Sequence, residues 1–259
     1  MNRLKDEVAI ITASGSGMGR GGALLFAKEG AKVVVSDINE KGGEETVSLI
    51  KREGGEAVFF KCDISNLKEV KDLVEFTAET YGGIDIVWNH AGIPGPAGCD
   101  VSEEEYDRTM NILLKPCYFI VQYALPYLRR STHNPAILFT SSTSGVVGSP
   151  SAPIYGAAKA GVVNMARSFA GILGKENIRC NCILPGPTSS PMWKGFSERP
   201  GQNSPEQIKA YNEKTIEGVP LHRMQEPYEL ASPALALVEP ASSYVTGAVL
   251  PSDGGVTAL

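Results

Sequence analysis

Val8-Ala9-Ile10-Ile11-Thr12-Ala13-Ser14-Gly15-Ser16-Gly17-Met18-Gly19 is the stretch that decides the fold. Its first four residues form a short continuous apolar run, which is typical of a strand buried on both faces. Three glycines at alternate positions follow and lead into a helical pattern. Glycines there let the backbone approach a pyrophosphate that rests on the helix N-terminus. The alternative is a glycine-rich turn that only allows tight packing of strand on helix.

Apolar runs and helical patterns alternate along the rest of the chain. Further strands are expected at 32–36, 57–60, 84–88, 136–140, 178–184 and 248–250. Such alternation predicts βαβ units. We therefore expect a doubly wound, Rossmann-type α/β fold, with a mostly parallel seven-stranded sheet and helices on both faces. No linker divides the sequence, so residues 1–259 are expected to form a single dinucleotide-binding and catalytic domain.

Several helix ends are readable from the sequence. Residues 66–69 (Asn-Leu-Lys-Glu) and 102–105 (Ser-Glu-Glu-Glu) have the form of capping boxes. The glycine pairs at 54–55 and 82–83 are expected to end helices. Long helices are expected over about 103–130 and 153–175.

Residues 186–220 break this rhythm. They contain five of the 17 prolines and little apolar periodicity. A long insertion after a strand is typical of a substrate lid. A lid is favoured over an irregular surface excursion because the segment includes Met192, Trp193 and Phe196. A solvated loop would leave these large apolar side chains without a packing role. Within the segment, Ser204-Pro205-Glu206-Gln207 looks like a helix start.

Composition narrows the function classes. The 259 residues are 42% hydrophobic and 20% charged, with a net charge of −5. No basic tract is present, so nucleic acid is not the expected partner. No stretch approaches 18 uninterrupted apolar residues and the charged N-terminus is not a signal peptide, so we expect a cytoplasmic protein without a membrane span. The five cysteines are scattered, which indicates neither a disulfide framework nor a metal site. His133 and His222 look like loop residues.

Asp37 is expected to end the second strand, 18 residues after Gly19. A carboxylate there can accept hydrogen bonds from the adenosine ribose hydroxyls and would repel a 2′-phosphate. No Arg or Lys lies beside it in the sequence, which favours NAD over NADP. The alternative role is an N-cap for the helix that begins near Glu40.

Tyr155 and Lys159 form the most informative pair. Their spacing of four places both side chains on one helix face. At ~4 Å and an effective dielectric constant of ~20, an ammonium attracts a phenolate by roughly 4 kcal/mol. That attraction could lower the pKa of a Tyr by up to about 3 units, against the opposing effect of burial. Such a phenol could donate and accept protons near neutral pH.

Two further polar positions could serve a reaction. Ser142 lies 13 residues before Tyr155, just past an expected strand, where a hydroxyl could polarise a carbonyl. Its neighbour Ser141 could serve equally by composition, and spacing does not choose between them. Asn111 lies inside an expected helix, where Asn is unfavourable on propensity, and this hints at a role. A solvated Asn is the alternative.

In combination these features resemble the short-chain dehydrogenase/reductase family over residues 6–257. The resemblance rests on Tyr155 with Lys159, Ser142, Asn111, the 12–19 glycine turn, Asp63, Asn89-His90-Ala91-Gly92 and Pro185-Gly186.

The resemblance implies a role for each polar residue. Tyr155 would be the general acid/base, and Lys159 would bind the nicotinamide ribose and lower the pKa of Tyr155. Ser142 would hold the substrate oxygen, and Asn111 would support a water-linked proton relay through Lys159. Cofactor contacts are expected at Ser14, Gly15, Ser16, Gly17, Met18, Gly19, Asp37, Ile38, Asp63, Ile64, Asn89, Ala91, Gly92, Tyr155, Lys159, Pro185, Gly186, Thr188 and Ser190.

The chain departs from the family pattern at three positions. Ala13 stands where a Gly is usual, His90 where an Asn is usual, and Ser190 where a Thr is usual. Ala13 puts the tightness of cofactor binding in doubt, and we expect positive φ or crowding at this residue. His90 is expected to be structural rather than catalytic.

The implied activity is NAD-dependent interconversion of a secondary alcohol and a ketone. An NADP-dependent carbonyl reductase and a non-catalytic dinucleotide sensor or scaffold are the alternatives. The expected pocket segments, 93–99, 143–154 and the lid, offer mainly small and apolar groups, which favours a neutral or weakly polar substrate. Lys194 and Arg199 could instead meet an acid. Surplus apolar surface on the two long helices, together with the resemblance, predicts a homodimer or homotetramer.

Overall fold

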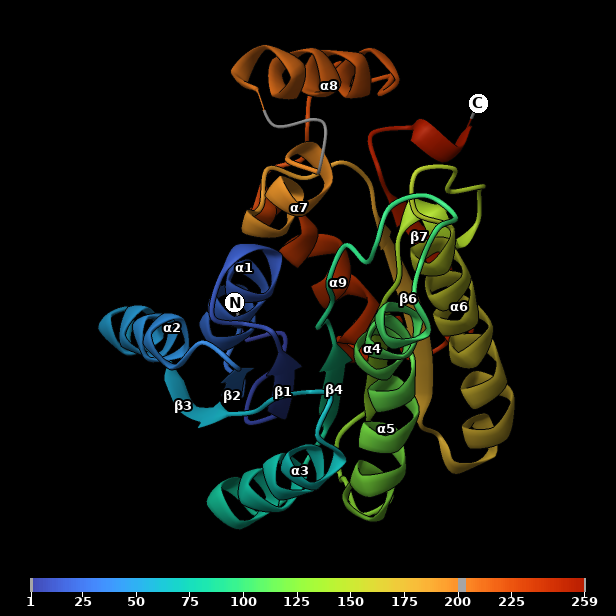
Figure 1. Ribbon diagram of the computed structural model, residues 1–259. Helices are drawn as coiled ribbons and strands as arrows, with labels where there is room; N and C mark the ends of the chain where they lie inside the picture. The colour runs from blue at the N-terminus through green and yellow to red at the C-terminus, as the bar shows by residue number, and fades with distance from the viewer. Residues whose placement is uncertain (1, 200–203, 259) are drawn as a thin grey trace.

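The structure is a computed structural model that describes residues 2–199 and 204–258. A seven-stranded sheet of order β3-β2-β1-β4-β5-β6-β7 runs through its centre (Figure 1), and every neighbouring pair is parallel. This confirms the expected doubly wound, Rossmann-type sheet. The strands are β1 (Val8–Thr12), β2 (Lys32–Asp37), β3 (Glu56–Lys61), β4 (Ile86–Asn89), β5 (Ala136–Thr140), β6 (Arg179–Pro185) and β7 (Val249–Ser252).

Helices connect the strands and cover both faces of the sheet. The α-helices are α1 (Gly17–Lys28), α2 (Glu40–Arg52), α3 (Leu67–Tyr81), α4 (Glu103–Leu113), α5 (Lys115–Leu128), α6 (Pro153–Leu173), α7 (Lys194–Ser197), α8 (Pro205–Glu217) and α9 (Ala231–Val238). Short 3₁₀ turns include η1 (Thr143–Gly145), η3 (Pro191–Trp193) and η4 (Pro227–Leu230).

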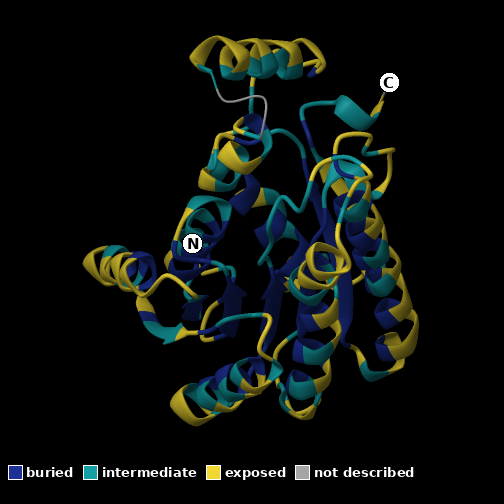
Figure 2. Cartoon of the chain, viewed as in Figure 1, coloured by how far each residue is buried: buried dark blue, intermediate teal, exposed yellow. Residues whose placement is uncertain are grey.

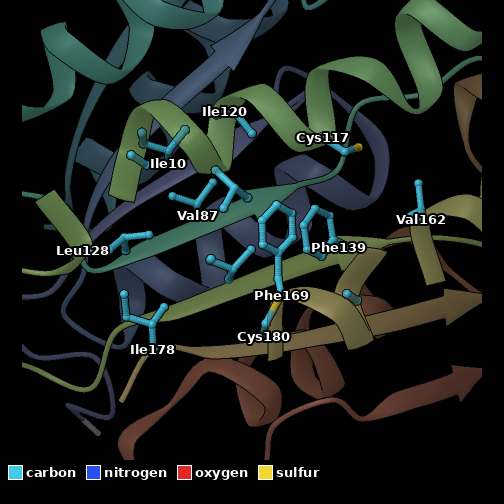
Figure 3. Close-up of a cluster of buried hydrophobic side chains, with 14 of the residues drawn as sticks. Ile10, Val87, Cys117, Ile120, Leu128, Phe139, Val162, Phe169, Ile178 and Cys180 are labelled. Atoms are coloured by element: carbon cyan, nitrogen blue, oxygen red, sulfur yellow. The ribbon is translucent and has the colours of Figure 1, made fainter. Parts of the chain in front are cut away.

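Apolar residues on alternate faces of the strands make two core layers. One layer joins strand residues such as Ile10 and Phe139 to helices α3, α5 and α6 (Figure 3). The other joins residues such as Ile11 and Val33 to helices α1 and α9. The central strands β1, β4, β5 and β6 are accordingly wholly buried, whereas the edge strands β3 and β7 are partly exposed and the helices expose their outer faces (Figure 2). This explains why the strands read as continuous apolar runs and not as alternating ones.

Strand β1 pairs with β2 on one side and with β4 on the other. The chain therefore reverses its direction across the sheet between β3 and β4. In open parallel sheets, ligands bind outside the carboxyl ends of the strands at such a switch point. The glycine turn follows β1 and residues 90–92 follow β4, so both lie at this point.

The helix expected over about 103–130 is wrong as one element. It is divided at Leu114, whose φ and ψ are −120° and −52°. Pro116 lies in the first turn of α5. Proline lacks the N–H that a continuous helix would need there and its ring clashes with the preceding turn. The break gives α4 and α5 separate directions (Figure 1).

Helix ends were largely predicted correctly. Ser102 and Glu105 form the expected capping box, and Gly82 ends α3 with φ of 84°. Only one of the two hydrogen bonds of the capping box predicted at Asn66 is formed. The Asn66 side chain accepts from Lys68 N–H, but Glu69 accepts from the backbone N–H of Asp63, 2.7 Å away.

All five cysteines are free thiols, and Cys180 and Cys182 are fully buried on β6. Among residues 2–199 and 204–258, no group of three or more His, Cys, Asp or Glu side chains could hold a metal ion. In the same ranges, no helix has the length and apolar character needed to span a membrane.

Candidate active site

Two adjoining cavities open at the carboxyl ends of the strands. The Asp37 cavity, about 370 Å³, is bordered by the glycine turn, the end of β2 and residues 62–64. The Tyr155 cavity, about 270 Å³, is bordered by residues 140–144, helix α6 and the segment after β6. The residues that line both are Met18, His90, Gly92, Ser190 and Met192. The two cavities therefore form one elongated cleft, whose middle is the wall that they share.

The glycine turn is a close-packed cradle. A Cβ on Gly15 would lie 2.9 Å from the Asp37 carboxyl carbon, and one on Gly19 would lie 2.3 Å from the Ala13 carbonyl oxygen. Gly17 has φ of 52° and lines the Asp37 cavity. The backbone at this helix N-terminus thus fits a phosphate group. Ser14 does not reach the cavity, because its buried hydroxyl donates to the Ile11 carbonyl.

Ala13 has φ of 52°, so the expected positive φ is confirmed. This left-handed conformation costs an L-residue with a Cβ about 1 kcal/mol relative to Gly. Ala13 also lines the Asp37 cavity. The strain is therefore stored in the wall of the site.

Asp37 lies at the end of β2 with its carboxylate fixed by backbone donors. Oδ2 accepts from Gly15 N–H and Oδ1 from Asn39 N–H, each at 2.9 Å. Asn39, not Asp37, caps α2 by accepting from Gly42 N–H. The alternative role of Asp37 as a helix cap is therefore wrong. Asp37 lines the cavity, and its carboxylate has further lone pairs that can accept hydrogen bonds from a bound molecule.

Two cations lie near Asp37 in space although neither is beside it in sequence. Lys61 on β3 is the register partner of Asp37, and its ammonium pairs with Glu40 at 3.3 Å. Arg20 on α1 donates to the Gly15 carbonyl and to Glu45. Both cations are thus engaged elsewhere, and neither lines the cavity. Among the described lining residues of the Asp37 cavity, the only Lys or Arg is Arg108 of α4, which the sequence did not suggest.

Tyr155 lies on α6 and is 5% exposed. Burial raises the pKa of Tyr155 to about 12, and a hydrogen bond with Ser142 opposes this increase. Lys159 lies 5.8 Å from the centroid of the Tyr155 ring, and its ammonium donates to the Thr140 carbonyl at 2.8 Å. The expected decrease in the pKa of Tyr155 is therefore wrong for this structure, because desolvation outweighs the hydrogen bond with Ser142 that lowers the pKa.

The structure distinguishes Ser142 from Ser141. The Ser141 hydroxyl is buried and donates to the Lys159 carbonyl at 2.7 Å, so it fixes α6 on β5. Ser142 begins η1, is partly exposed, and lies on the cavity wall within hydrogen-bonding reach of Tyr155. Ser142 is thus the hydroxyl available to a bound molecule.

Asn111 lies on α4 and is not among the described residues that line either cavity, so its role in a proton relay stays a prediction. Leu113, at the end of α4, and Lys159 both lie near Gly92. A Cβ on Gly92 would lie 3.4 Å from Leu113 Cδ2 and 3.7 Å from Lys159 Nζ. Leu113 is fully buried in the apolar cluster that also includes Tyr155.

The other residues predicted to contact the cofactor divide into those that line a cavity and those that do not. Asn89 is 4% exposed and lines neither cavity, as a residue that braces the sheet should be. Gly15 and Gly19 do not line the Asp37 cavity, but they allow the turn to pack closely on Asp37 and Ala13. Those that line the Asp37 cavity are Ser16, Gly17, Met18, Asp37, Ile38, Asp63, Ile64, Ala91, Gly92 and Ser190. Those that line the Tyr155 cavity are Met18, Gly92, Ser142, Tyr155, Lys159, Pro185, Gly186, Thr188 and Ser190.

The segment after β6 covers the Tyr155 cavity with aromatic rings. Phe196 of α7 meets the Tyr155 ring edge-on at 5.4 Å between centroids, and Trp193 lies 6.0 Å from Phe196. Tyr211 of α8 packs on Trp193. The helix start at Ser204 is confirmed by a capping box with Gln207. Residues 200–203 of the expected lid lie outside the described residues.

Lys194 and Arg199, the two cations that could have met an acidic substrate, do not line the cavity. Lys194 is exposed. Arg199 donates to the Ser151 carbonyl at 2.7 Å and stacks over Phe196 at 5.3 Å. Arg199 therefore ties α7 to the loop before α6 and does not form the cavity wall.

The chain is similar to known oxidoreductases along its whole length. A family model described as enoyl-(acyl carrier protein) reductase matches residues 12–257. A 2,5-dichloro-2,5-cyclohexadiene-1,4-diol dehydrogenase of Sphingobium indicum is 36% identical, with 100% of each chain covered.

Two solved structures have the same fold. Levodione reductase has a TM-score of 0.92 at 31% identity, covering 98% of each chain. A 7α-hydroxysteroid dehydrogenase complexed with NADH and 7-oxo glycochenodeoxycholic acid has a TM-score of 0.90 at 31% identity, covering 98% of this chain and 96% of the other. With the parallel sheet, the glycine cradle and the Tyr155–Lys159 helix in place, the chain belongs to the short-chain dehydrogenase/reductase family of nicotinamide-dinucleotide-dependent oxidoreductases.

Proposed function

We propose that this protein interconverts a secondary alcohol and a ketone with NAD as the hydride carrier. The observation that carries the proposal is the pair of hydroxyls, Tyr155 and Ser142, on the wall of one end of an elongated cleft. The other end holds a glycine cradle and the Asp37 carboxylate, which would accept hydrogen bonds from the adenosine ribose. When bound, the nicotinamide ring supplies or accepts the hydride.

In the direction of reduction, the two hydroxyls bind the ketone oxygen. Ser142 donates a hydrogen bond that polarises the carbonyl, and Tyr155 donates the proton that the oxygen needs as the carbon accepts hydride. With its pKa raised to about 12, Tyr155 is protonated at neutral pH and ready for this step. In the direction of oxidation Tyr155 must accept the proton, so that direction is favoured as pH rises.

Lys159 lies on the same face of α6 as Tyr155, one helical turn further along the chain. Its buried ammonium is held by the Thr140 carbonyl. It has two further donors, which suit the hydroxyls of a nicotinamide ribose. A relay through Asn111 stays a proposal that the family resemblance supports, since Asn111 is not among the described residues that line the cleft.

We propose a neutral, ring-containing substrate. Trp193, Phe196 and Tyr211 line the Tyr155 cavity, and no Asp, Glu or Arg is among its described lining residues. A saturated or aromatic ring gains both burial and ring contact against such a wall. The relative from Sphingobium, named for a cyclohexadiene diol, supports this substrate class.

Turnover of a panel of cyclic and open-chain secondary alcohols with NAD, followed by absorbance of NADH, tests the proposal. Tyr155→Phe should reduce kcat at least tenfold and leave NADH affinity within about twofold, because only the transferable proton is lost. NADH binding without turnover of any alcohol or ketone would support the sensor alternative. Retention of most of kcat in Tyr155→Phe would contradict the acid/base assignment.

Two organisational proposals accompany this function. The segment 186–220 acts as a substrate lid, supported by the contact of Phe196 with Tyr155. The protein is a homodimer or homotetramer, supported by large exposed side chains on the two helices expected to associate. Tyr118 of α5 is 47% exposed and Ile172 of α6 is 59% exposed.

A further inference from the structure

His90 occupies the shared wall of the two cavities, where the family pattern has an asparagine. It follows β4 directly, and its backbone N–H donates to Thr12 Oγ1 at 2.9 Å. Its ring packs edge-on against Trp88 with 5.2 Å between centroids. A Cβ on Gly19 would lie 3.0 Å from His90 Cδ2, so the ring also contacts the start of α1. The ring is therefore held on several sides.

The hydrogen bonds of Thr140 determine which ring nitrogen of His90 carries the proton. Trp88 Nε1 donates to Thr140 Oγ1 at 2.8 Å, and an indole can only donate. Thr140 Oγ1 also lies 3.0 Å from His90 Nδ1. Among the described residues, Nδ1 is the acceptor within reach of the Thr140 hydroxyl proton. Nδ1 therefore accepts, and the neutral ring carries its proton on Nε2.

The ring stays neutral over the working range of pH. Burial, with the nearby charge of Lys159, lowers the pKa of His90 to about 3. His90 is thus a preset donor and not a titrating acid or base.

The Nε2–H group is free to serve a ligand. No hydrogen bond to Nε2 is formed within the described part of the chain. In the described part of the chain, the Nε2 atom of His90 is not one of the fully buried polar atoms without a partner. This unpaired atom is therefore accessible from the cleft that His90 lines. Asp37 and Tyr155 lie at opposite ends of the cleft, whereas His90 lies on the wall between them. A dinucleotide that spans the cleft places its diphosphate and nicotinamide ribose along this wall.

We propose that His90 Nε2–H donates a hydrogen bond to an oxygen of the diphosphate–ribose segment of the dinucleotide. This rests on the cofactor cleft of the proposed function and assigns His90 a cofactor-positioning role beyond its structural one. The Trp88–Thr140–His90 chain fixes the donor before the cofactor binds, so little conformational freedom is lost on binding.

Equilibrium binding to His90→Asn and His90→Gln tests the proposal without turnover. The Asn amide reaches the position of Nδ1 and keeps the bond to Thr140, whereas the Gln amide reaches the position of Nε2. For His90→Asn, Kd for ADP-ribose and NADH should rise roughly tenfold, as expected for loss of a hydrogen bond to a charged group. His90→Gln should restore most of that affinity, and AMP should bind all three proteins within about twofold.

Equal losses in the two variants, unchanged ADP-ribose affinity in His90→Asn, or an AMP loss as large as the ADP-ribose loss would overturn the proposal. Because all ligands are measured by binding, these results are independent of whether the protein turns over any alcohol.

If the variants fold poorly, ¹⁵N spectra of the wild-type imidazole keep the proposal falsifiable. The expected pattern is the neutral Nε2–H form from pH 5 to 8, with an Nε2 shift on addition of ADP-ribose and none with AMP. An Nδ1–H form, or the same spectrum with and without ADP-ribose, would refute it.

Discussion

Glu7 lies at the amino end of β1, far from the cleft, and offers a direct test of the electrostatics of the fold. Its side chain is 1% exposed, and Oε2 has no hydrogen-bond partner among the described residues. Burial, with the nearby charge of Asp85, raises the pKa of Glu7 from 4.5 to about 7. His133 and Arg179 oppose the increase only in part.

The sign of the pH dependence follows from this shift. The folded state binds a proton more tightly than the unfolded state. The contribution of this tighter proton binding to the stability of the folded state is fully present below pH ~4.5 and is lost as pH rises through about 7. A difference of about 2.5 pKa units corresponds to roughly 3 kcal/mol at ~1.36 kcal/mol per unit. Above pH 7 the folded protein therefore carries a buried carboxylate with little compensation.

Glu7→Gln replaces the group by a neutral one of the same shape. At pH 8 the variant should be more stable than the wild type by about 2–3 kcal/mol, or roughly 4–12 °C in Tm. At pH 5 the difference should shrink to about 1 kcal/mol or less, since Glu7 is then protonated in the folded state while its unfolded carboxyl has begun to ionise. Urea unfolding at both pH values measures the difference, with the exposed Glu53→Gln as control. A variant equally or less stable than the wild type at pH 8 would refute the reasoning.

Four further predictions concern the cleft and the assembly. Wild-type kcat/KM should favour NAD over NADP by about tenfold or more, roughly 1.4 kcal/mol, and Asp37→Ala should narrow that ratio; equal use of both cofactors by the wild type would contradict the role of Asp37. Ala13→Gly should relieve the positive φ and tighten NADH binding a few-fold in a fluorescence titration, whereas an unchanged or weaker Kd would mean that the turn has adapted to alanine. Phe196→Leu should raise KM for cyclohexanol at least fivefold more than KM for hexan-2-ol, and equal effects on the two would argue against a ring-binding wall. Light scattering at micromolar concentration should give the mass of a dimer or tetramer, and a mass of 27.6 kDa would exclude association.

The sequence by itself determined the features that depend on local pattern. Continuous apolar runs identified the buried strands, and glycine spacing identified the cradle after β1, because both follow from backbone geometry over a few residues. The spacing of Tyr155 and Lys159 likewise placed them together on α6, since a helix brings residues four apart onto one face. The division of α4 from α5 was also readable from Pro116, but the apolar pattern through this region obscured it.

Only the tertiary structure decided which side chains meet across elements. It selected Ser142 over Ser141 as the hydroxyl on the cavity wall, and it fixed the proton of His90 through Thr140 and Trp88. It also set the pKa of Tyr155, because the desolvation that raises it depends on Phe196 and other groups distant in sequence. Burial and long-range hydrogen bonding are properties of the packed molecule, and no spacing within a single helix or strand encodes them.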